Sequence, residues 1–229
     1  MLEVRDLNVK IGTTTILRKV ALSVARGAIV GITGRNGAGK TTLMRSIMGL
    51  LPIESGSMQM AGKDLVAMPA YKRTSLGIGY APEDRRLIPD LSVEENLCAP
   101  VWALGQADAG PNLKRAYQII PELQEFAPRK AMELSGGQQK LVAIGRALMT
   151  GQQLVLLDEP FEGVAPALSL RIAEVVGALR AEGFSALLSG ADLQHAASVL
   201  DHNYEIDRGS IIGSHAVVHG DPSVQNAKE

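Results

Sequence analysis

The sequence predicts an α/β fold, and three observations support this expectation. Residues 28–33 and 154–157 are nearly continuous apolar runs, which is the pattern of strands buried on both faces of a sheet. Each run leads into glycine-rich or acidic residues and then into a helical pattern. Between the two runs, residues 91–149 are mainly helical, so we expect a helical insertion in an α/β core.

The amino-terminal part predicts antiparallel strands. Residues 2–9 and 16–24 alternate apolar and polar side chains, and Gly12 and Gly27 stand at the expected turns. After the first buried run, residues 40–48 have the pattern of a helix. Two strands, a buried strand and a helix are therefore expected in this order.

The rest of the chain continues the α/β order. Five prolines are expected to separate the helical segments of the insertion: Pro89, Pro100, Pro111, Pro121 and Pro128. Beyond the second buried run we expect an amphipathic helix over residues 168–180, a strand over 184–188 and a strand-rich end through Ile212. The sequence contains no internal repeat, which excludes a duplicated chain.

Composition favours a folded protein without a strong electrostatic preference for a partner. Hydrophobic residues make up 46% and charged residues 21% of the chain, and the net charge is −1. This balance argues against nucleic acid as a partner. The single cysteine, Cys98, cannot form an intrachain disulfide, and no apolar run approaches the ~20 residues of a membrane span. We therefore expect a cytoplasmic protein.

A glycine-rich segment, residues 34–41, has the spacing of a phosphate-binding loop and lies between a buried strand and a helix. Backbone N–H groups of such a loop hold the β- and γ-phosphates, while Lys40 adds a positive charge and Thr41 a hydroxyl ligand for Mg²⁺. An ordinary glycine-rich turn is the alternative, and the flanking strand and helix argue against it. ATP and Mg²⁺ are the expected ligands, and the expected nucleotide-binding residues are Gly34, Arg35, Asn36, Gly37, Ala38, Gly39, Lys40, Thr41 and Thr42.

Two acidic residues, Asp158 and Glu159, follow the second buried run, at a strand end where α/β sheets bind ligands. Asp158 can hold Mg²⁺ through water, and Glu159 can polarise the water that attacks the γ-phosphate. The alternative is a solvated strand end or the start of a helix, and the phosphate-binding loop favours the functional interpretation. Glu159 is the expected catalytic residue.

A third motif, residues 134–140, precedes an apolar-striped helix, and Ser135 and Gln138 are expected to form a capping box there. A well-capped helix is the simplest explanation. The segment, Leu-Ser-Gly-Gly-Gln-Gln-Lys, also resembles the signature of ABC ATPases, which in that family contacts the γ-phosphate of ATP held by the opposite subunit. By this resemblance, the residues expected to contact the partner's ATP are Ser135, Gly136, Gly137 and Gln138.

The resemblance to ABC ATPase subunits covers essentially the whole chain, because the phosphate-binding loop, Asp158-Glu159-Pro160 and a turn at Gly163 agree with it. It implies an ATP hydrolase that forms ADP and phosphate and is coupled to transport. The implied partners are a second ABC ATPase subunit, identical or different, then membrane permease subunits and, indirectly, a solute-binding protein. The chain would lie on the inner face of the cell membrane, bound there through the permease.

The resemblance also implies a domain organisation. Residues 1–229 would form a single P-loop NTPase domain of the ABC ATPase type, with a mixed-sheet core and an antiparallel β subdomain. The core would cover residues 1–86 and 150–229, and an inserted helical subdomain would cover residues 87–149.

Within the family, residues 79–86 and 91–97 resemble importers of branched-chain amino acids or urea, and residues 144–149 and 163–166 agree with them. Sugar-importer ATPases carry a similar Pro-Glu-Asp-Arg segment. The leading hypothesis is therefore the ATP-binding subunit of an ABC importer for branched-chain amino acids or related small solutes. An importer ATPase for sugars, or a hydrolysis-weak ABC ATPase that regulates a non-transport partner, are the alternatives.

Four residues depart from the family pattern, the first three being Glu83, Ile11 and Ala165. Glu83 stands where most members have a glutamine, and its carboxylate can still bind Mg²⁺, so the expected Mg²⁺ ligands are Thr41, Asp158 and Glu83. Ile11 takes the place of the aromatic residue that stacks on adenine, and Ala165 that of an aspartate. Weaker adenine binding is expected, since a base–aromatic stack is worth ~1–3 kcal/mol.

The largest departure lies at the switch position, where the family commonly has a histidine and this chain has Ala191. An alanine cannot donate a hydrogen bond to the γ-phosphate, so a low intrinsic rate is expected. His195 follows about one helical turn later and is either a substitute donor or a histidine of the surface or of helix packing.

Overall fold

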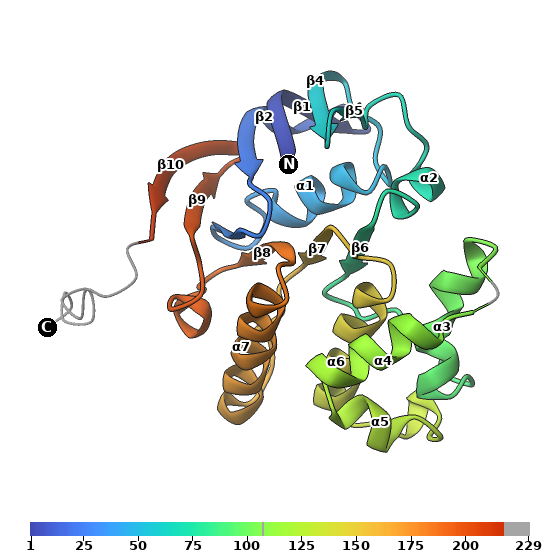
Figure 1. Ribbon diagram of the computed structural model, residues 1–229. Helices are drawn as coiled ribbons and strands as arrows, with labels where there is room; N and C mark the ends of the chain where they lie inside the picture. The colour runs from blue at the N-terminus through green and yellow to red at the C-terminus, as the bar shows by residue number, and fades with distance from the viewer. Residues whose placement is uncertain (107, 218–229) are drawn as a thin grey trace, which may run out of the picture.

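The computed structural model describes residues 1–106 and 108–217, and it has the α/β architecture that the sequence predicts, with two sheets and flanking helices (Figure 1). The carboxyl end of the predicted core, residues 218–229, lies outside the described residues. Within the described residues, no helix is both long and apolar enough to cross a membrane.

The smaller sheet is antiparallel and has the strand order β2-β1-β4-β5. Its strands are β1 (Leu2–Ile11), β2 (Thr14–Val24), β4 (Ser55–Met60) and β5 (Lys63–Asp64). The two expected amino-terminal strands are confirmed and are longer than predicted. The sequence does not predict β4, because only Met58 and Met60 of its six residues are buried and its glycine and serines give no strand pattern.

The larger sheet is mixed and has the order β10-β9-β3-β8-β7-β6. Its strands are β3 (Ile29–Thr33), β6 (Ile78–Ala81), β7 (Leu154–Leu157), β8 (Ser185–Gly190), β9 (His202–Asp207) and β10 (Ser210–Ala216). All neighbours are parallel except β10, which runs antiparallel to β9. The carboxyl ends of the parallel strands therefore lie at one edge, where open α/β sheets bind ligands.

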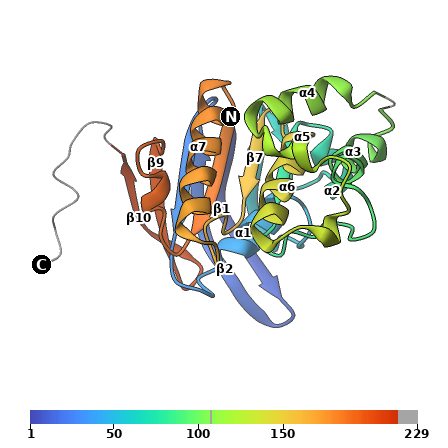
Figure 2. The same cartoon turned by 90° about the horizontal axis from the view of Figure 1, so that it is seen from below.

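Helices cover both faces of the larger sheet. They are α1 (Lys40–Ile47), α2 (Ala70–Thr74), α3 (Val93–Ala103), α4 (Gly110–Ile119), α5 (Glu122–Phe126), α6 (Gly136–Leu148) and α7 (Pro166–Ala181). Helix α1 lies between the two sheets, and α7 lies on the opposite face of the larger sheet (Figure 1). Figure 2 shows α3 to α6 gathered on one side of the molecule and β9 and β10 on the other, with α7 between them.

Strand β7 shows how the chain fills both faces of the larger sheet. Leu154 and Leu156 belong to the apolar cluster under the smaller sheet, whereas Val155 and Leu157 belong to the cluster under α6 and α7. Successive side chains of a strand point to opposite faces, so a strand buried on both faces is apolar at every position. Each such side chain contributes about 1.5–3 kcal/mol by its burial. This double burial fixes the strand end that Asp158 follows.

One proline does not separate helical segments as predicted. Pro100 lies inside α3, near its carboxyl end, whereas Pro111 is in the first turn of α4 and Pro121 precedes α5 as expected. The ring removes one main-chain hydrogen bond of the helix. Leu97 and Val101, on either side of Pro100, are fully buried, and we infer that their packing offsets this loss.

Candidate functional site

The loop between β3 and α1 has a shape that only glycine permits at three positions. A Cβ on Gly34 would lie 2.2 Å from the carbonyl oxygen of Ile206. Gly37 and Gly39 have φ of 82° and 112°, in the left-handed region that favours glycine. These constraints place the loop and the amino end of α1 together on the wall of one cleft.

Lys40 begins α1, and its side chain is almost fully buried. Its Nζ donates hydrogen bonds to the carbonyl oxygens of Gly34, at 2.5 Å, and Arg35, at 3.1 Å. The same Nζ pairs with Oε1 of Glu159 at 3.0 Å. A buried ammonium needs such partners, so the loop and the carboxylate after β7 hold the cation between them.

Three hydroxyl groups surround the carboxylate of Asp158. Thr41 Oγ1 and Ser189 Oγ donate to Oδ1 at 3.1 and 2.7 Å, and Tyr80 donates to Oδ2 at 3.0 Å. Burial, together with the Asp158 carboxylate, raises the pKa of Tyr80 well above its usual value, so the phenol remains a donor. The sequence analysis missed Tyr80 and Ser189. Each of them places a hydroxyl on one of the two strands that flank β7, β6 and β8. This arrangement can be recognised only when the strand order is known.

Glu159 has φ of 50°, an uncommon value for a residue with a side chain. Its N–H donates to Ser189 Oγ at 3.0 Å, and its carbonyl oxygen accepts from Lys140 Nζ at 2.6 Å. Lys140 also donates to the carbonyl oxygen of Glu162 at 3.0 Å. Burial lowers the pKa of this lysine, as does the nearby charge of Arg85. The sequence analysis missed the role of Lys140, because nothing in its spacing relates it to Glu159.

Several of these residues line a cleft of about 430 Å³. The described residues on its wall are Ile16, Asn36, Gly37, Gly39, Lys40, Thr41, Thr42, Glu83, Glu159 and Glu162. The structure thus brings together the first turn of α1, Glu83 and Glu159, which come from three separate parts of the sequence. Ile11, at the expected adenine position, is 49% exposed and is not among these lining residues.

The chemistry of the cleft fits a phosphate with a divalent cation. The amino end of α1 and the buried ammonium of Lys40 suit an anion. The hydroxyl of Thr41, hydrogen-bonded to Asp158, and the carboxylate of Glu83 are oxygen ligands of the kind that Mg²⁺ takes.

The motif at residues 134–140 forms the amino end of α6. Ser135 is the N-cap, and the predicted capping box with Gln138 is confirmed, with hydrogen bonds of 3.3 and 3.0 Å. The carbonyl oxygen of Gly136 accepts from Arg85 at 3.0 Å. None of the four expected partner-site residues is among the described residues that line the cleft. Their contact with a partner's ATP stays a prediction.

Comparison with known proteins decides the family. Residues 17–162, more than half of the chain, match the sequence profile of the family described as "ABC transporter". The chain belongs to this family. Curated ABC relatives include the high-affinity branched-chain amino acid transport ATP-binding protein BraG of Pseudomonas aeruginosa, 34% identical over 99% of this chain and 98% of BraG. The lipopolysaccharide export system ATP-binding protein LptB of Escherichia coli strain K12 is 31% identical over 91% of this chain and 85% of LptB.

Solved structures of ABC proteins confirm the fold. A nucleotide-free ATP-binding cassette of an ABC transporter has a TM-score of 0.83 and 30% identity, covering 99% of this chain and 94% of the cassette. The ADP conformation of MJ1267, an ATP-binding cassette of an ABC transporter, has a TM-score of 0.79 and 31% identity, covering 94% of this chain and 91% of MJ1267. This chain is therefore an ATP-binding member of the ABC family.

The expected switch position and His195 both lie beyond the end of β8. Ala191 directly follows Gly190, the last residue of β8. His195 lies in the short turn Gln194–Ala196, with its ring centroid 5.8 Å from that of Phe161. Neither Ala191 nor His195 is among the described residues on the cleft wall. Whether His195 reaches a bound nucleotide stays a prediction.

Proposed function

We propose that this chain is the ATP-hydrolysing subunit of an ABC importer for branched-chain amino acids or related small solutes. The observation that carries hydrolysis is the contact of Lys40 with Glu159 and of Thr41 with Asp158, beside one cleft whose wall includes Lys40, Thr41 and Glu159. The observation that supports the substrate is the similarity to BraG along nearly the full length of both chains.

In the proposed reaction, the amino end of α1 and Lys40 bind the β- and γ-phosphates of ATP. Mg²⁺, held by Thr41, Asp158 and Glu83, would neutralise charge on the phosphate oxygens. Lys40 then has a phosphate as its partner, which frees the carboxylate of Glu159 to polarise the attacking water. Water would attack the γ-phosphorus, the bond to the bridging oxygen of the β-phosphate would break, and ADP, phosphate and a proton would be released.

The signature residues at the amino end of α6 would complete the ATP site of a second subunit. The proposed assembly is therefore a head-to-tail pair, identical or different, on two membrane permease subunits at the inner face of the membrane. A solute-binding protein would take part only through the permease. Binding of ATP would close the pair, and hydrolysis would reopen it.

One observation favours a second candidate. Ala191 removes a donor at the switch position, which fits a hydrolysis-weak ABC ATPase that regulates another protein. The similarity to LptB, an export protein, leaves a different substrate and transport in the opposite direction as competing proposals. A sugar importer is a further alternative.

Transport in reconstituted vesicles tests the proposal. The chain would be co-purified with its permease subunits and placed in liposomes with the cognate solute-binding protein. We expect ATP-dependent movement of labelled leucine toward the side that carries this chain, and none with Glu159→Gln. Movement in the opposite direction, or of a competing sugar alone, would contradict the amino-acid importer.

A further inference from the structure

Lys140 is a buried cation on the helix that carries the signature residues. It lies in the second turn of α6, and only 7% of its surface is exposed. Its Nζ donates to two main-chain carbonyl oxygens among the described residues, those of Glu159 at 2.6 Å and Glu162 at 3.0 Å. Burying an ammonium costs desolvation energy, so its two hydrogen bonds to the turn at Glu159–Glu162 indicate that it stabilises this turn.

The turn that Lys140 binds needs support. Glu159 has a left-handed backbone, which a residue with a side chain keeps only when its surroundings hold it there. Ser189 accepts from the N–H of Glu159, and Lys140 donates to its carbonyl oxygen, which also accepts from the N–H of Glu162 at 3.2 Å. The peptide groups on both sides of the Glu159 Cα are therefore held by side chains from β8 and α6.

We propose that Lys140 is a positioning residue for Glu159, which it fixes through the carbonyl oxygen of that residue. This inference rests on the proposed function, in which Glu159 polarises the attacking water. It also has a consequence for the pair. The amino end of α6 would contact one ATP and Lys140 would orient the carboxylate that acts on the other, so one rigid helix would link the two sites.

The proposal predicts a loss in turnover without a loss in ATP affinity. Lys140 is not among the described residues that line the cleft, so removing its charge leaves the phosphate contacts in place. A reacting group displaced by about 1 Å costs on the order of 10² in rate. We therefore expect Lys140→Met to lower kcat by about 10- to 100-fold, while the Kd for ATP changes by less than about twofold.

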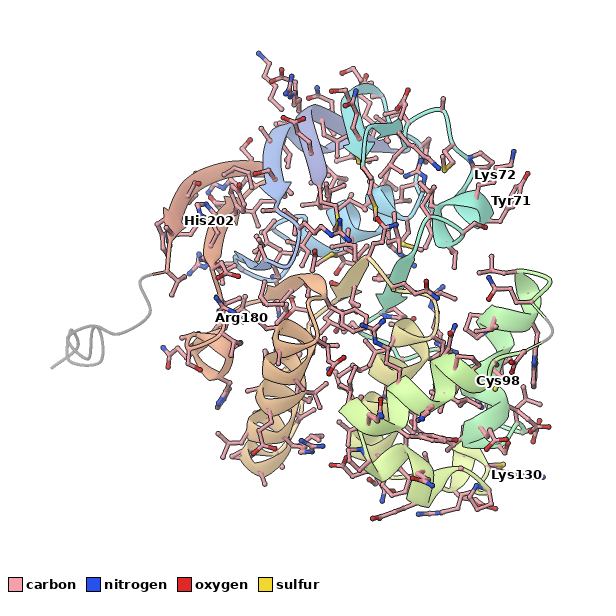
Figure 3. The ribbon with its side chains drawn as sticks, viewed as in Figure 1. Tyr71, Lys72, Cys98, Lys130, Arg180 and His202 are labelled. Carbon is pink, nitrogen blue, oxygen red and sulfur yellow. The ribbon has the colours of Figure 1, made fainter. Side chains whose placement is uncertain are left out.

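The experiment uses the purified full chain with Mg-ATP. Phosphate release would be measured over a range of ATP concentrations, the Kd by equilibrium titration, and folding by urea denaturation. Lys140→Arg should recover most of kcat, because a guanidinium can donate to both carbonyl oxygens. Lys130→Met is the matched control, since Lys130 is exposed at the far end of the helical part of the molecule (Figure 3), and it should behave as the wild type.

A double variant shows whether Lys140 acts through Glu159. In the Glu159→Gln background, Lys140→Met should lower the residual rate by less than about twofold, since residues that act as a unit are not additive. If Lys140→Met does not fold, Lys140→Gln, which keeps one donor, should give an intermediate kcat at unchanged Kd.

Four results would overturn the inference: a kcat for Lys140→Met within twofold of wild type, a parallel loss of ATP affinity, a folded Lys140→Arg as slow as Lys140→Met, or full additivity with Glu159→Gln. A wild-type chain that releases no phosphate would contradict the proposed hydrolysis and this inference together. A hydrolysing wild type with an unchanged Lys140→Met would contradict only the role of Lys140.

Discussion

The hydroxyl of Ser189 forms hydrogen bonds with both acidic residues that follow β7. Its removal should therefore lower the free energy of unfolding by an amount that the structure allows us to calculate. Ser189→Ala removes a hydrogen bond to Asp158, worth about 1.5–3 kcal/mol for a charged acceptor, and leaves the N–H of Glu159 without its acceptor, at about 1–3 kcal/mol. Thr41 and Tyr80 still donate to Asp158, so the lower part of the sum applies. We expect the free energy of unfolding to fall by about 2.5–4 kcal/mol.

Urea denaturation at neutral pH measures this loss. With an m-value of about 3 kcal/mol/M, the midpoint should fall by about 0.8–1.3 M. Ser185→Ala is the matched control on the same strand, because Ser185 Oγ accepts from the N–H of Gly27 at 2.8 Å, a bond between uncharged groups. Gly27 is only half-buried, so water can replace the lost acceptor, and this variant should cost only about 0.5–1.5 kcal/mol. A Ser189→Ala midpoint at or above that of Ser185→Ala would refute the reasoning.

Three further predictions test separate parts of the account. Glu159→Gln should keep ATP binding but trap an ATP-bound pair, visible by size measurement with ATP, because the amide does not polarise water; hydrolysis at the wild-type rate would show that Glu159 is not catalytic. Ala191→His should raise the rate of phosphate release by at most ~10²–10³-fold, and it should rescue any loss caused by His195→Ala. If neither change alters the rate, the switch position does not limit hydrolysis. Glu122→Gln should lower the free energy of unfolding at pH 7 by about 0.5–1 kcal/mol, since it breaks the ion pair with Arg171. The hydrogen bond from Arg171 lowers the pKa of Glu122, so the wild-type advantage is present above the ordinary carboxyl pKa and lost as pH falls through the lowered value; a difference that persists at pH 3 would contradict this origin.

The parts of the fold that sequence reasoning predicted are those with strong local patterns. The continuous apolar run at β7 follows from burial on both faces, and the capping box at Ser135 and Gln138 is local by nature. The strand β4 was missed because its burial comes from only two methionines. The place of Pro100 inside α3 was also missed, because it depends on the packing of that helix against others.

The candidate site shows the same division. Motif spacing predicted Lys40, Thr41, Asp158 and Glu159, and the structure brings their side chains together. Tyr80, Ser189 and Lys140 carry no motif, since their contacts depend on strand order and on where α6 packs. Single residues whose function comes from tertiary neighbours alone cannot be recognised from their spacing in one sequence.

Binding of Mg-ATP to the loop after β3 is the central claim, and equilibrium titration of the purified chain tests it most directly. The wild type should bind Mg-ATP saturably, and Lys40→Ala should lose most of that affinity, because it deletes the buried cation that faces the phosphates. Lys72→Ala is the matched control, since Lys72 is exposed on α2 (Figure 3), and it should bind as the wild type does. Unchanged affinity in a folded Lys40→Ala variant would contradict the account.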